Sequence, residues 1–538
     1  MIPILLLVSF VILLSCILDK FSLKSGVPAL LLFIGLGMIF GEEGLFKISF
    51  YDFSMANNVC STALIFIMFY GGFGTKWKEA KKVIIEASIL SSLGVFLTAL
   101  FVAVGVHFLL SWSWLESFLF GSILSSTDAA SVFSILKRKK LGLKENTASL
   151  LEVESGSNDP CSYMMTLISL LYLTGEVRGS TLFSYVILQL GGGLFFGGIF
   201  SFLTRFLLKK LHFAEGLDTL FITGSVIAAY ALPGYFNGNG YLSVYIFGIL
   251  LGNSSFPHKE NLSSFYDGVT GLAQMFIFFL LGLLSTPSRL VDAFMPALVI
   301  FLILTFLARP ISVFSLLFPF HTSKEKKLLV SFAGLRGAAS IVFAIMTIVH
   351  HYTPKQDVFH IVFCVVLLSM IFQASSLAWV AIRLNMIDSK IDVMEIFTDY
   401  ASKTKLQFFE IPIPKNHYWI GMRIKDLLLP PNILILNIVR NTEQIVPYGD
   451  FIIQENDLIH LSILGNNQKL SFDIDMYLLP SKSKWIGKTV QEYGEKKHVF
   501  ISLIVRKEKA LMPKATLVLE EEDQIYFHKK EKNPPLKS

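Results

Sequence analysis

The stretch of sequence that decides the fold is Leu151-Glu152-Val153-Glu154-Ser155-Gly156-Ser157-Asn158-Asp159-Pro160. It lies inside an otherwise apolar segment, residues 147–172, which is long enough to cross a hydrocarbon core of about 30 Å. Carboxylates inside a lipid-spanning helix cost several kcal/mol each unless they are partnered or functional. The stretch therefore indicates a membrane helix whose polar residues have a specific role.

The spacing of these polar residues places them on two adjacent faces of a helix. At about 3.6 residues per turn, Glu154 and Asn158 share one face, and Ser155 and Asp159 share the next. Pro160 has no N–H, so the backbone carbonyl four residues before it loses its usual partner near Asp159. We therefore expect this helix to present a polar strip to a neighbouring element.

The composition separates a membrane part from a water-soluble part. Of 538 residues, 53% are hydrophobic and 16% are charged, whereas an ordinary soluble domain has roughly 25% charged residues. Residues 1–383 contain 45 charged residues and residues 384–538 contain 41. The formal net charge of +6 comes from short clusters of Lys and Arg between apolar runs, which is the pattern of membrane loops. The sequence therefore predicts no nucleic-acid partner.

Apolar stretches along residues 1–383 predict a polytopic α-helical membrane protein. We predict about thirteen spans, at 3–18, 26–41, 57–73, 84–110, 115–134, 147–172, 182–208, 216–232, 239–253, 266–285, 293–318, 328–350 and 357–382. Gly35, Gly37 and Gly41 in the second span indicate close helix packing rather than a nucleotide-binding loop.

Loop charges give the orientation of these spans. Alternate loops carry 18 Lys and Arg on one side of the membrane and only four on the other, namely Lys47, Arg178, Arg289 and Lys355. Because positively charged loops stay in the cytoplasm, we expect the N-terminus outside and the C-terminus inside a bacterial cytoplasmic membrane.

The spans can be arranged as two inverted halves. An odd number of spans allows the first six and the last six to be inverted copies, a common construction in secondary transporters. The fifth span then corresponds to the twelfth, and these two carry the polar insertions Ser125-Ser126-Thr127-Asp128 and Gly334-Leu335-Arg336-Gly337. Interrupted helices at matching positions mark a midplane ion site, so we predict two interrupted helices beside such a site.

The polar residues of these spans suit a monovalent cation. A carboxylate from Asp159, free carbonyls and hydroxyls are the oxygen ligands that replace the water shell of Na⁺ or K⁺. Asp128, at the break in the fifth span, would supply a second acidic or carbonyl-orienting group. The alternative is that Asp128 and Asp159 merely satisfy helix ends.

Two Arg residues lie well inside predicted spans and need partners. Arg309 and Arg336 keep their charge even in a membrane. Glu154 is the obvious anion, so we expect one Arg to form a structural ion pair with Glu154 and the other to brace a helix break. Neither Arg is expected to bind the ion itself.

Three motifs resemble the sodium/proton exchanger branch of the monovalent cation/proton antiporters. They are Thr127-Asp128, Glu154 to Pro160, and Gly334-Leu335-Arg336-Gly337-Ala338, and the resemblance covers residues 1–383. It implies a homodimer of thirteen-span protomers, each with a core bundle that moves like an elevator against a dimerisation bundle.

The resemblance also implies roles for single residues. Asp159 would bind cation or proton, and Asn158 with the Thr127-Asp128 region and Ser155 would complete the site. Glu154 would pair with Arg309. Asn158 stands where electrogenic relatives have a second Asp, which looks like the electroneutral type. No resident cofactor or metal is implied beyond the transported K⁺ or Na⁺ and H⁺.

The charge on Asp159 then determines the expected mechanism. A lone carboxylate in low dielectric is costly, whereas one that holds a proton or a monovalent cation is nominally neutral and can change sides. Because both ligands compete for one group, we expect cation affinity to fall as the pH falls.

The tail contains an internal repeat offset by 66 residues. Trp419-Ile420-Gly421 recurs as Trp485-Ile486-Gly487, and Val439-Arg440 recurs as Val505-Arg506. Alternating β-rich runs follow a short helical patch in each copy. We predict a linker at 384–405 and two α+β modules at 406–470 and 471–538.

These modules resemble the C-terminal subdomain of potassium-conductance regulators. The resemblance implies a small regulatory ligand, such as a cyclic dinucleotide, and favours K⁺ over Na⁺ as the transported cation. A passive assembly domain is the alternative.

Other function classes fit less well. A ligand-gated potassium channel would share the membrane part and the tail, but it should carry a Thr-Val-Gly-Tyr-Gly-like carbonyl filter, and the sequence has none. An enzyme would need a nucleophile and a base, or metal-type His spacing, which the sequence does not show. We therefore predict a transporter rather than an enzyme.

Overall fold

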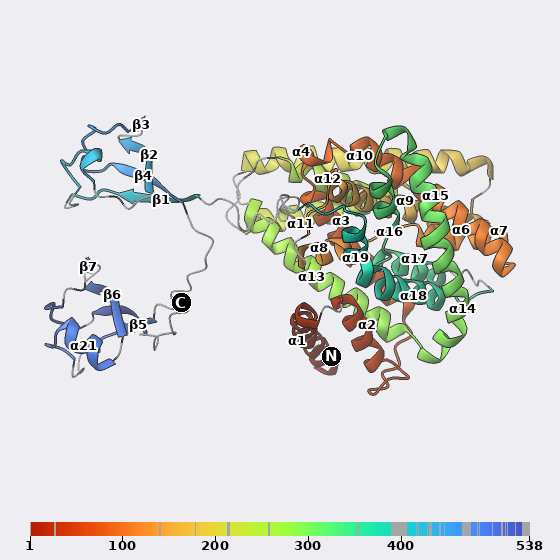
Figure 1. Cartoon of the computed structure of the whole chain (residues 1–538), viewed down its shortest axis with the longest axis horizontal. Helices are drawn as coiled ribbons and strands as arrows, with labels where there is room; N and C mark the ends of the chain where they lie inside the picture. Colours follow the sequence, from red (N-terminus) through yellow and green to blue (C-terminus); the bar gives the residue numbers. More distant parts are fainter. Residues whose placement is uncertain are drawn as a thin grey trace. The chain divides into compact units, whose positions relative to one another are not determined.

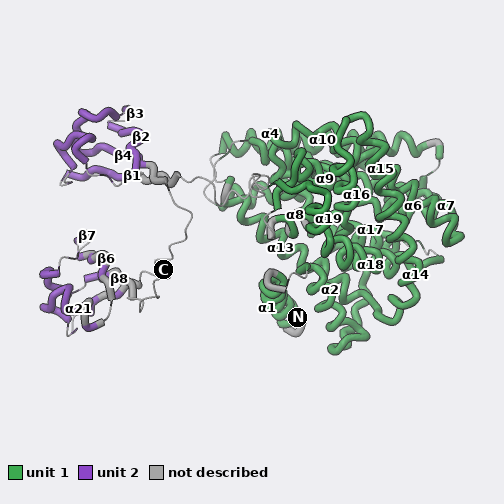
Figure 2. The backbone as a smooth tube through the Cα atoms, in the orientation of Figure 1, with its two compact units in different colours: residues 1–401 green, residues 402–538 purple. Residues whose placement is uncertain are grey.

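The computed structural model contains a helical unit, residues 1–401, and a β-rich unit, residues 402–538 (Figure 2). The residues that it describes are 2–25, 28–138, 141–177, 179–211, 216–254, 256, 259–350, 352, 355–388, 406–415, 417, 419–427, 429, 433–440, 443–445, 447–464, 475–480, 483, 485–497, 499–506, 509–511, 513, 515–521 and 523–529. Most of the predicted linker, residues 389–405, lies outside these ranges.

By their mutual contacts, the helices of the helical unit, which Figure 1 labels, form two groups that we call the scaffold bundle and the core bundle. The scaffold bundle contains α1 (Ile2–Ser25), α2 (Ala29–Phe40), α3 (Phe53–Gly74), α10 (Gly179–Leu211), α11 (Leu217–Tyr235), α12 (Gly240–Gly252) and α13 (Lys259–Leu284). The core bundle contains α4 (Trp77–Ala80), α5 (Ile84–Ile89), α6 (Val95–Leu110), α7 (Trp114–Leu124), α8 (Ala129–Arg138), α9 (Thr147–Leu173), α14 (Pro287–Ile303), α15 (Arg309–Leu316), α16 (Lys324–Phe332), α17 (Ala338–Val349), α18 (Val358–Leu368) and α19 (Ser375–Arg383). Helices α9 and α17 of the core bundle also contact α3 of the scaffold bundle.

Eight helical segments of the described chain are long and apolar enough to cross a membrane. Four shorter apolar helices, α2, α7, α12 and α17, also coincide with predicted spans, and so does the 27-residue α9. The helical membrane fold is therefore confirmed, whereas the number thirteen stays a prediction.

Glycine contacts hold the scaffold helices at short distances. A Cβ on Gly37 of α2 would stand 2.1 Å from the carbonyl oxygen of Phe279 in α13, and a Cβ on Gly252 of α12 would stand 2.1 Å from that of Phe73 in α3. Only a residue without a side chain permits such backbone approach. The packing prediction therefore holds for Gly37. It is wrong for Gly35, which has no atom within 4 Å of its Cβ position.

Both predicted interruptions are present. Helix α7 ends at Leu124 and α8 begins at Ala129, and α16 ends at Phe332 before α17 begins at Ala338. The intervening residues form irregular backbone at the two positions that the predicted inverted arrangement pairs with each other. Irregular backbone inside a membrane protein is tolerated where protein or a cavity surrounds it.

Three π-helical turns were not predicted from the sequence. They cover Leu90–Gly94, Leu304–Ala308 and Ser369–Ala374. The first two lie in the fourth and eleventh predicted spans, which the inverted arrangement pairs with each other. Single π turns inside α-helices are frequent at functional sites, and the second one ends directly before Arg309.

The tail unit contains two antiparallel sheets. The first has the order β1-β4-β2-β3, with β1 at Leu406–Pro412, β2 at Ile433–Arg440, β3 at Glu443–Ile445 and β4 at Leu458–Leu464. The second has the order β5-β8-β6-β7, with β5 at Asp475–Leu478, β6 at Val499–Arg506, β7 at Lys509–Leu511 and β8 at Gln524–Lys529, and it carries α21 at Val490–Lys497.

The two sheets agree in detail at an offset of 66 residues. Arg440 Nε donates to Asp457 Oδ1 at 2.7 Å, and Arg506 Nε donates to Asp523 Oδ1 at the same distance. Both central strands carry a bulge at the equivalent position. These matches support two copies of one module, whereas the predicted module boundaries and the linker remain predictions.

Candidate functional site

The two helix breaks cross and satisfy each other's backbone groups. The N–H of Asp128 donates to the carbonyl oxygen of Leu335 at 2.8 Å, and Arg336 Nη1 donates to the carbonyl oxygen of Ser126 at 2.5 Å. A Cβ on Gly337 would stand 2.6 Å from Cβ of Asp128, so the crossing requires a glycine there. Arg336 therefore braces a break, the role expected of one of the two buried Arg residues.

The polar strip of α9 faces the first break. Asn158 Nδ2 donates to Thr127 Oγ1 at 2.5 Å, and the N–H of Thr127 donates to Asn158 Oδ1 at 3.3 Å. The hydroxyl of Ser155 donates to the carbonyl oxygen of Thr127 at 2.5 Å. The structure thus brings Thr127, Ser155 and Asn158 together, with their hydroxyl, amide and carbonyl oxygens close to one another.

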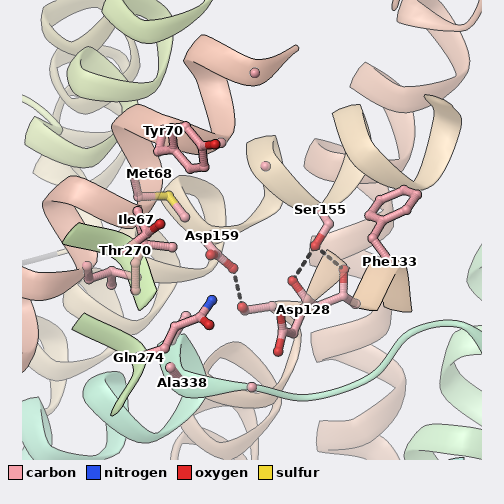
Figure 3. A pocket seen from close by; sticks show the side chains of 18 of the residues that line it. Ile67, Met68, Tyr70, Asp128, Phe133, Ser155, Asp159, Thr270, Gln274 and Ala338 are labelled. Carbon is pink, nitrogen blue, oxygen red and sulfur yellow. Dashed lines mark hydrogen bonds between the residues drawn. The ribbon is translucent and has the colours of Figure 1, made fainter. Parts of the chain in front are cut away.

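Asp159 is buried beside this group of oxygens. The residue is 6% exposed, and the hydroxyl of Ser126 donates a hydrogen bond to its Oδ1. Within the described ranges, no Lys, Arg or His lies within ion-pair distance of this carboxylate. Figure 3 shows Asp159 between the side chains of α3 and α13 on one side and Asp128 with Ser155 on the other. Within these ranges the carboxylate therefore has no ion-paired counter-charge, and the charge of Arg336 acts on it only from beyond ion-pair distance.

Asp128 uses its carboxylate to cap a helix. Its Oδ1 and Oδ2 accept hydrogen bonds from the backbone N–H and the hydroxyl of Ser131, at 3.3 and 2.5 Å. Asp128 lies directly before α8, which begins at Ala129, so this is the geometry of an N-cap. The contacts of Asp128 with Ser131 are therefore those of a residue that satisfies a helix end, which was the alternative interpretation. Asp128 also lines the cavity described below.

Glu154 lies one and a half turns from Asp159 but has a different environment. Arg309 Nη2 stands 2.6 Å from Glu154 Oε1, and both side chains are almost completely buried. These are the partners that the family resemblance implied. The pair ties α9 to α15 inside the core bundle and keeps the Glu154 charge compensated.

A cavity of about 460 Å³ reaches Asp159. Its core wall comes from α9, the first helix break and the start of α17, and its scaffold wall comes from α3 and α13 (Figure 3). Four carboxylates line it, those of Asp128, Glu152, Asp159 and Asp267. This arrangement can admit a hydrated cation from one side of the protein to a buried carboxylate.

The scaffold wall contains residues that the sequence analysis missed. Asp267, Thr270 and Gln274 of α13 all line the cavity. Their spacing of three and four residues inside a predicted span was a visible signal, because such positions share one helix face. The spacing alone does not show which neighbouring helix this face meets, so it did not identify a site.

Comparison with protein families matches residues 7–383 to "Sodium/hydrogen exchanger, transmembrane". The chain belongs to this exchanger family. It is therefore a multi-pass membrane protein. A second match, to the TrkA-C domain, covers residues 408–469 and 476–528 of this exchanger, that is, both tail sheets.

Among curated relatives, the exchanger is 32% identical over 448 residues to the K(+)/H(+) antiporter NhaP of Alkalimonas amylolytica, covering 81% of this chain and 77% of the relative. It is 31% identical over 463 residues to the K(+)/H(+) antiporter NhaP2 of Shewanella sp. (strain MR-4), covering 85% and 80%. Among solved structures, the sodium proton antiporter MjNhaP1 from Methanocaldococcus jannaschii at pH 8 aligns with a TM-score of 0.61 and 27% identity, over 68% of this chain and 98% of that one.

Proposed function

We propose that the protein exchanges a monovalent cation for protons across a bacterial cytoplasmic membrane, with Asp159 as the shared binding group. The supporting observation is that this buried carboxylate borders a cavity and, among the described residues, has no cationic partner. A bare anion there is costly, whereas one proton or one monovalent cation makes the site nominally neutral. With a cation or a proton bound, Asp159 can then move from one side of the membrane to the other. Without either ligand, this movement is suppressed.

The surrounding oxygens support a weakly held alkali cation. The carbonyl of Thr127 and the hydroxyls of Ser126 and Ser155 lie next to Asp159 in the hydrogen-bond network of the break. Such neutral oxygens replace a hydration shell without adding charge. Asn158 holds Thr127 in place and is itself uncharged. Because Asp128 caps α8 and residue 158 is an uncharged Asn, Asp159 is the carboxylate that exchanges its ligand, which supports one-for-one, electroneutral exchange.

The position of the cavity supports a cytoplasmic opening. Gly71 and Gly74 at the C-terminal end of α3 line it, and the next residues along the chain are the basic cluster at 76–82. Basic loops stay on the cytoplasmic side. With the N-terminus outside and the tail inside, the described arrangement is the inward-facing one.

The division into two bundles supports a moving core. Asp159 and both helix breaks belong to the core bundle, whereas the opposite cavity wall belongs to the scaffold bundle. Movement of the core against the scaffold would carry Asp159 from one side of the membrane to the other. We assign the homodimer contact to the scaffold bundle, because it has to stay fixed while the core moves.

K⁺ is the favoured cation, and the tail is the regulator. The curated relatives that cover most of this chain are named K(+)/H(+) antiporters. Both tail sheets match the TrkA-C domain. A small ligand such as a cyclic dinucleotide, bound at the tail, would set the rate of exchange.

Purified protein in liposomes tests the function. A K⁺ gradient should drive proton movement in the absence of a membrane potential, and separate additions of K⁺, Na⁺ and Li⁺ rank the ions. Asp159→Asn should reduce exchange to the level of protein-free liposomes. Appreciable residual exchange in this variant would reject the assignment, and proton movement that requires an imposed potential would indicate a channel.

A further inference from the structure

A polar stripe on α13 faces the cavity from the scaffold side. Asp267 and Gln274 are seven residues apart, which is almost two helical turns and about 10 Å along the axis. Thr270 lies between them, and all three line the cavity. One turn beyond Gln274, the stripe ends at Phe278, which is 1% exposed. The last polar position of the stripe is therefore Gln274.

Two members of the stripe already have partners. Thr270 Oγ1 donates to the carbonyl oxygen of Tyr266 at 2.8 Å, and Tyr70 of α3 donates to Asp267 Oδ1 at 3.4 Å. Gln274 is different. Throughout the described part of the chain, its amide makes no hydrogen bond to protein. An amide inside a membrane helix without a partner is unfavourable, unless water or a ligand in the cavity satisfies it.

The direction of the Gln274 side chain shows what it faces. In Figure 3 it extends from α13 towards the carboxylate of Asp159, across the cavity from Asp128 and Ser155. The core bundle surrounds Asp159 with hydroxyl, carbonyl and amide groups on one side only. The opposite side is open to the cavity and to α13.

We propose that Gln274 is the scaffold's contribution to the cation site in the inward-facing state. Its amide oxygen would contact the cation held by Asp159, directly or through a retained water, and supply a neutral ligand opposite the core oxygens. Because the ligand is neutral, the one-for-one balance of charge is unchanged. Gln274 belongs to the scaffold bundle and Asp159 to the core bundle, so this ligand is present only when the core faces the cytoplasm.

This inference rests on the proposed exchange, and sidedness tests it separately. Gln274→Met removes the amide at nearly constant volume. We expect the apparent KM for K⁺ presented at the cytoplasmic face to rise about three- to tenfold, the usual effect of losing one hydrogen-bond-strength contact. The KM for K⁺ presented at the outer face should stay within twofold of the unmodified protein, and the maximal rate should change little.

Comparing both faces in one preparation removes the effect of incomplete folding. Gln274→Leu should behave like Gln274→Met, because both lack the amide. Leu272→Met serves as the matched control on the same helix. The Leu272 side chain is 39% exposed on the surface of the protein, so this substitution should leave both KM values unchanged.

Equal changes at both faces, or no change at either, would overturn the role of Gln274 while leaving exchange itself intact. Absence of exchange in the unmodified protein would instead reject the proposed function.

Discussion

Two carboxylates on one helix, Glu154 and Asp159, have opposite environments. Both are buried, with exposed fractions of 0% and 6%. Glu154 has the guanidinium of Arg309 at 2.6 Å, whereas Asp159 has a hydroxyl and an open cavity. Burial alone therefore does not distinguish the proposed transport residue from a structural acid in this protein.

The difference lies in whether the compensating charge is permanent. A fixed Arg neutralises Glu154 in every state, so neither a proton nor a cation gains by binding there. Asp159 must find its positive charge in solution, and that charge can be exchanged. The same residue chemistry thus gives a structural pair at one position and the proposed binding site five residues later.

The largest expected effect that separates the two acids is on stability. Glu154→Gln leaves the Arg309 charge buried without an anion, and breaking a buried pair in this way costs about 3–5 kcal/mol. We expect a clearly lower melting temperature in detergent and loss of exchange. The double variant Glu154→Gln with Arg309→Met should recover most of the stability, because neither charge remains.

The equivalent change at the other acid should not destabilise the fold. Asp159→Asn removes a carboxylate that has no cationic partner, so its melting temperature should equal or exceed that of the unmodified protein. If Asp159→Asn lowered the melting temperature as much as Glu154→Gln, Asp159 would be structural and the contrast between the two acids would disappear.

A second, smaller effect concerns pH. Because a proton and a cation compete for Asp159, the apparent KM for K⁺ should rise as the pH falls, approaching tenfold per pH unit once the carboxylate is mostly protonated. The rise should be visible in initial rates at saturating and subsaturating K⁺. A KM that does not depend on pH would show that the two ligands use different groups.

The smallest effect concerns the hydroxyl on Asp159. Ser126→Ala removes one neutral hydrogen bond to the carboxylate, so we expect cation affinity to change by about two- to tenfold with normal folding. Ser169→Ala is a suitable control, because Ser169 Oγ donates to the carbonyl oxygen of Met165 in its own helix. A complete loss of exchange in Ser126→Ala would mean that Ser126 does more than orient Asp159.

Much of this fold could be predicted from the sequence because its signals are local. Polar insertions in apolar spans marked both helix breaks, and the 66-residue repeat predicted two similar tail modules. In the structure, Arg440 and Arg506 of these modules make equivalent ion pairs. Other features depend on packing between distant segments. The π turn at Leu304–Ala308 has no sequence signature, and only tertiary contacts distinguish Gly37 from Gly35.

The candidate site was predictable to a similar degree. The polar strip on α9 follows from helical periodicity. In the structure, Asn158 and Ser155 of this strip donate hydrogen bonds to Thr127. The sequence did not predict which group the Asp128 side chain contacts. An Asp at a helix break can serve either as an N-cap or as an ion ligand, and the two roles look the same in the sequence. Gln274 was missed because the sequence does not say which face of α13 meets the core bundle.

The backbone exchange between the two breaks has a mechanical consequence. Asp128 and Leu335 come from opposite halves of the chain, yet each supplies the hydrogen-bond partner that the other lacks. Separating the breaks would leave the Asp128 N–H and the buried Leu335 carbonyl without this partner, which is unfavourable for buried backbone groups. The two crossing segments therefore behave as one rigid part, and thermal opening of the site piece by piece is disfavoured. The movement that we propose for exchange therefore has to occur where the two bundles meet, outside the proposed cation site.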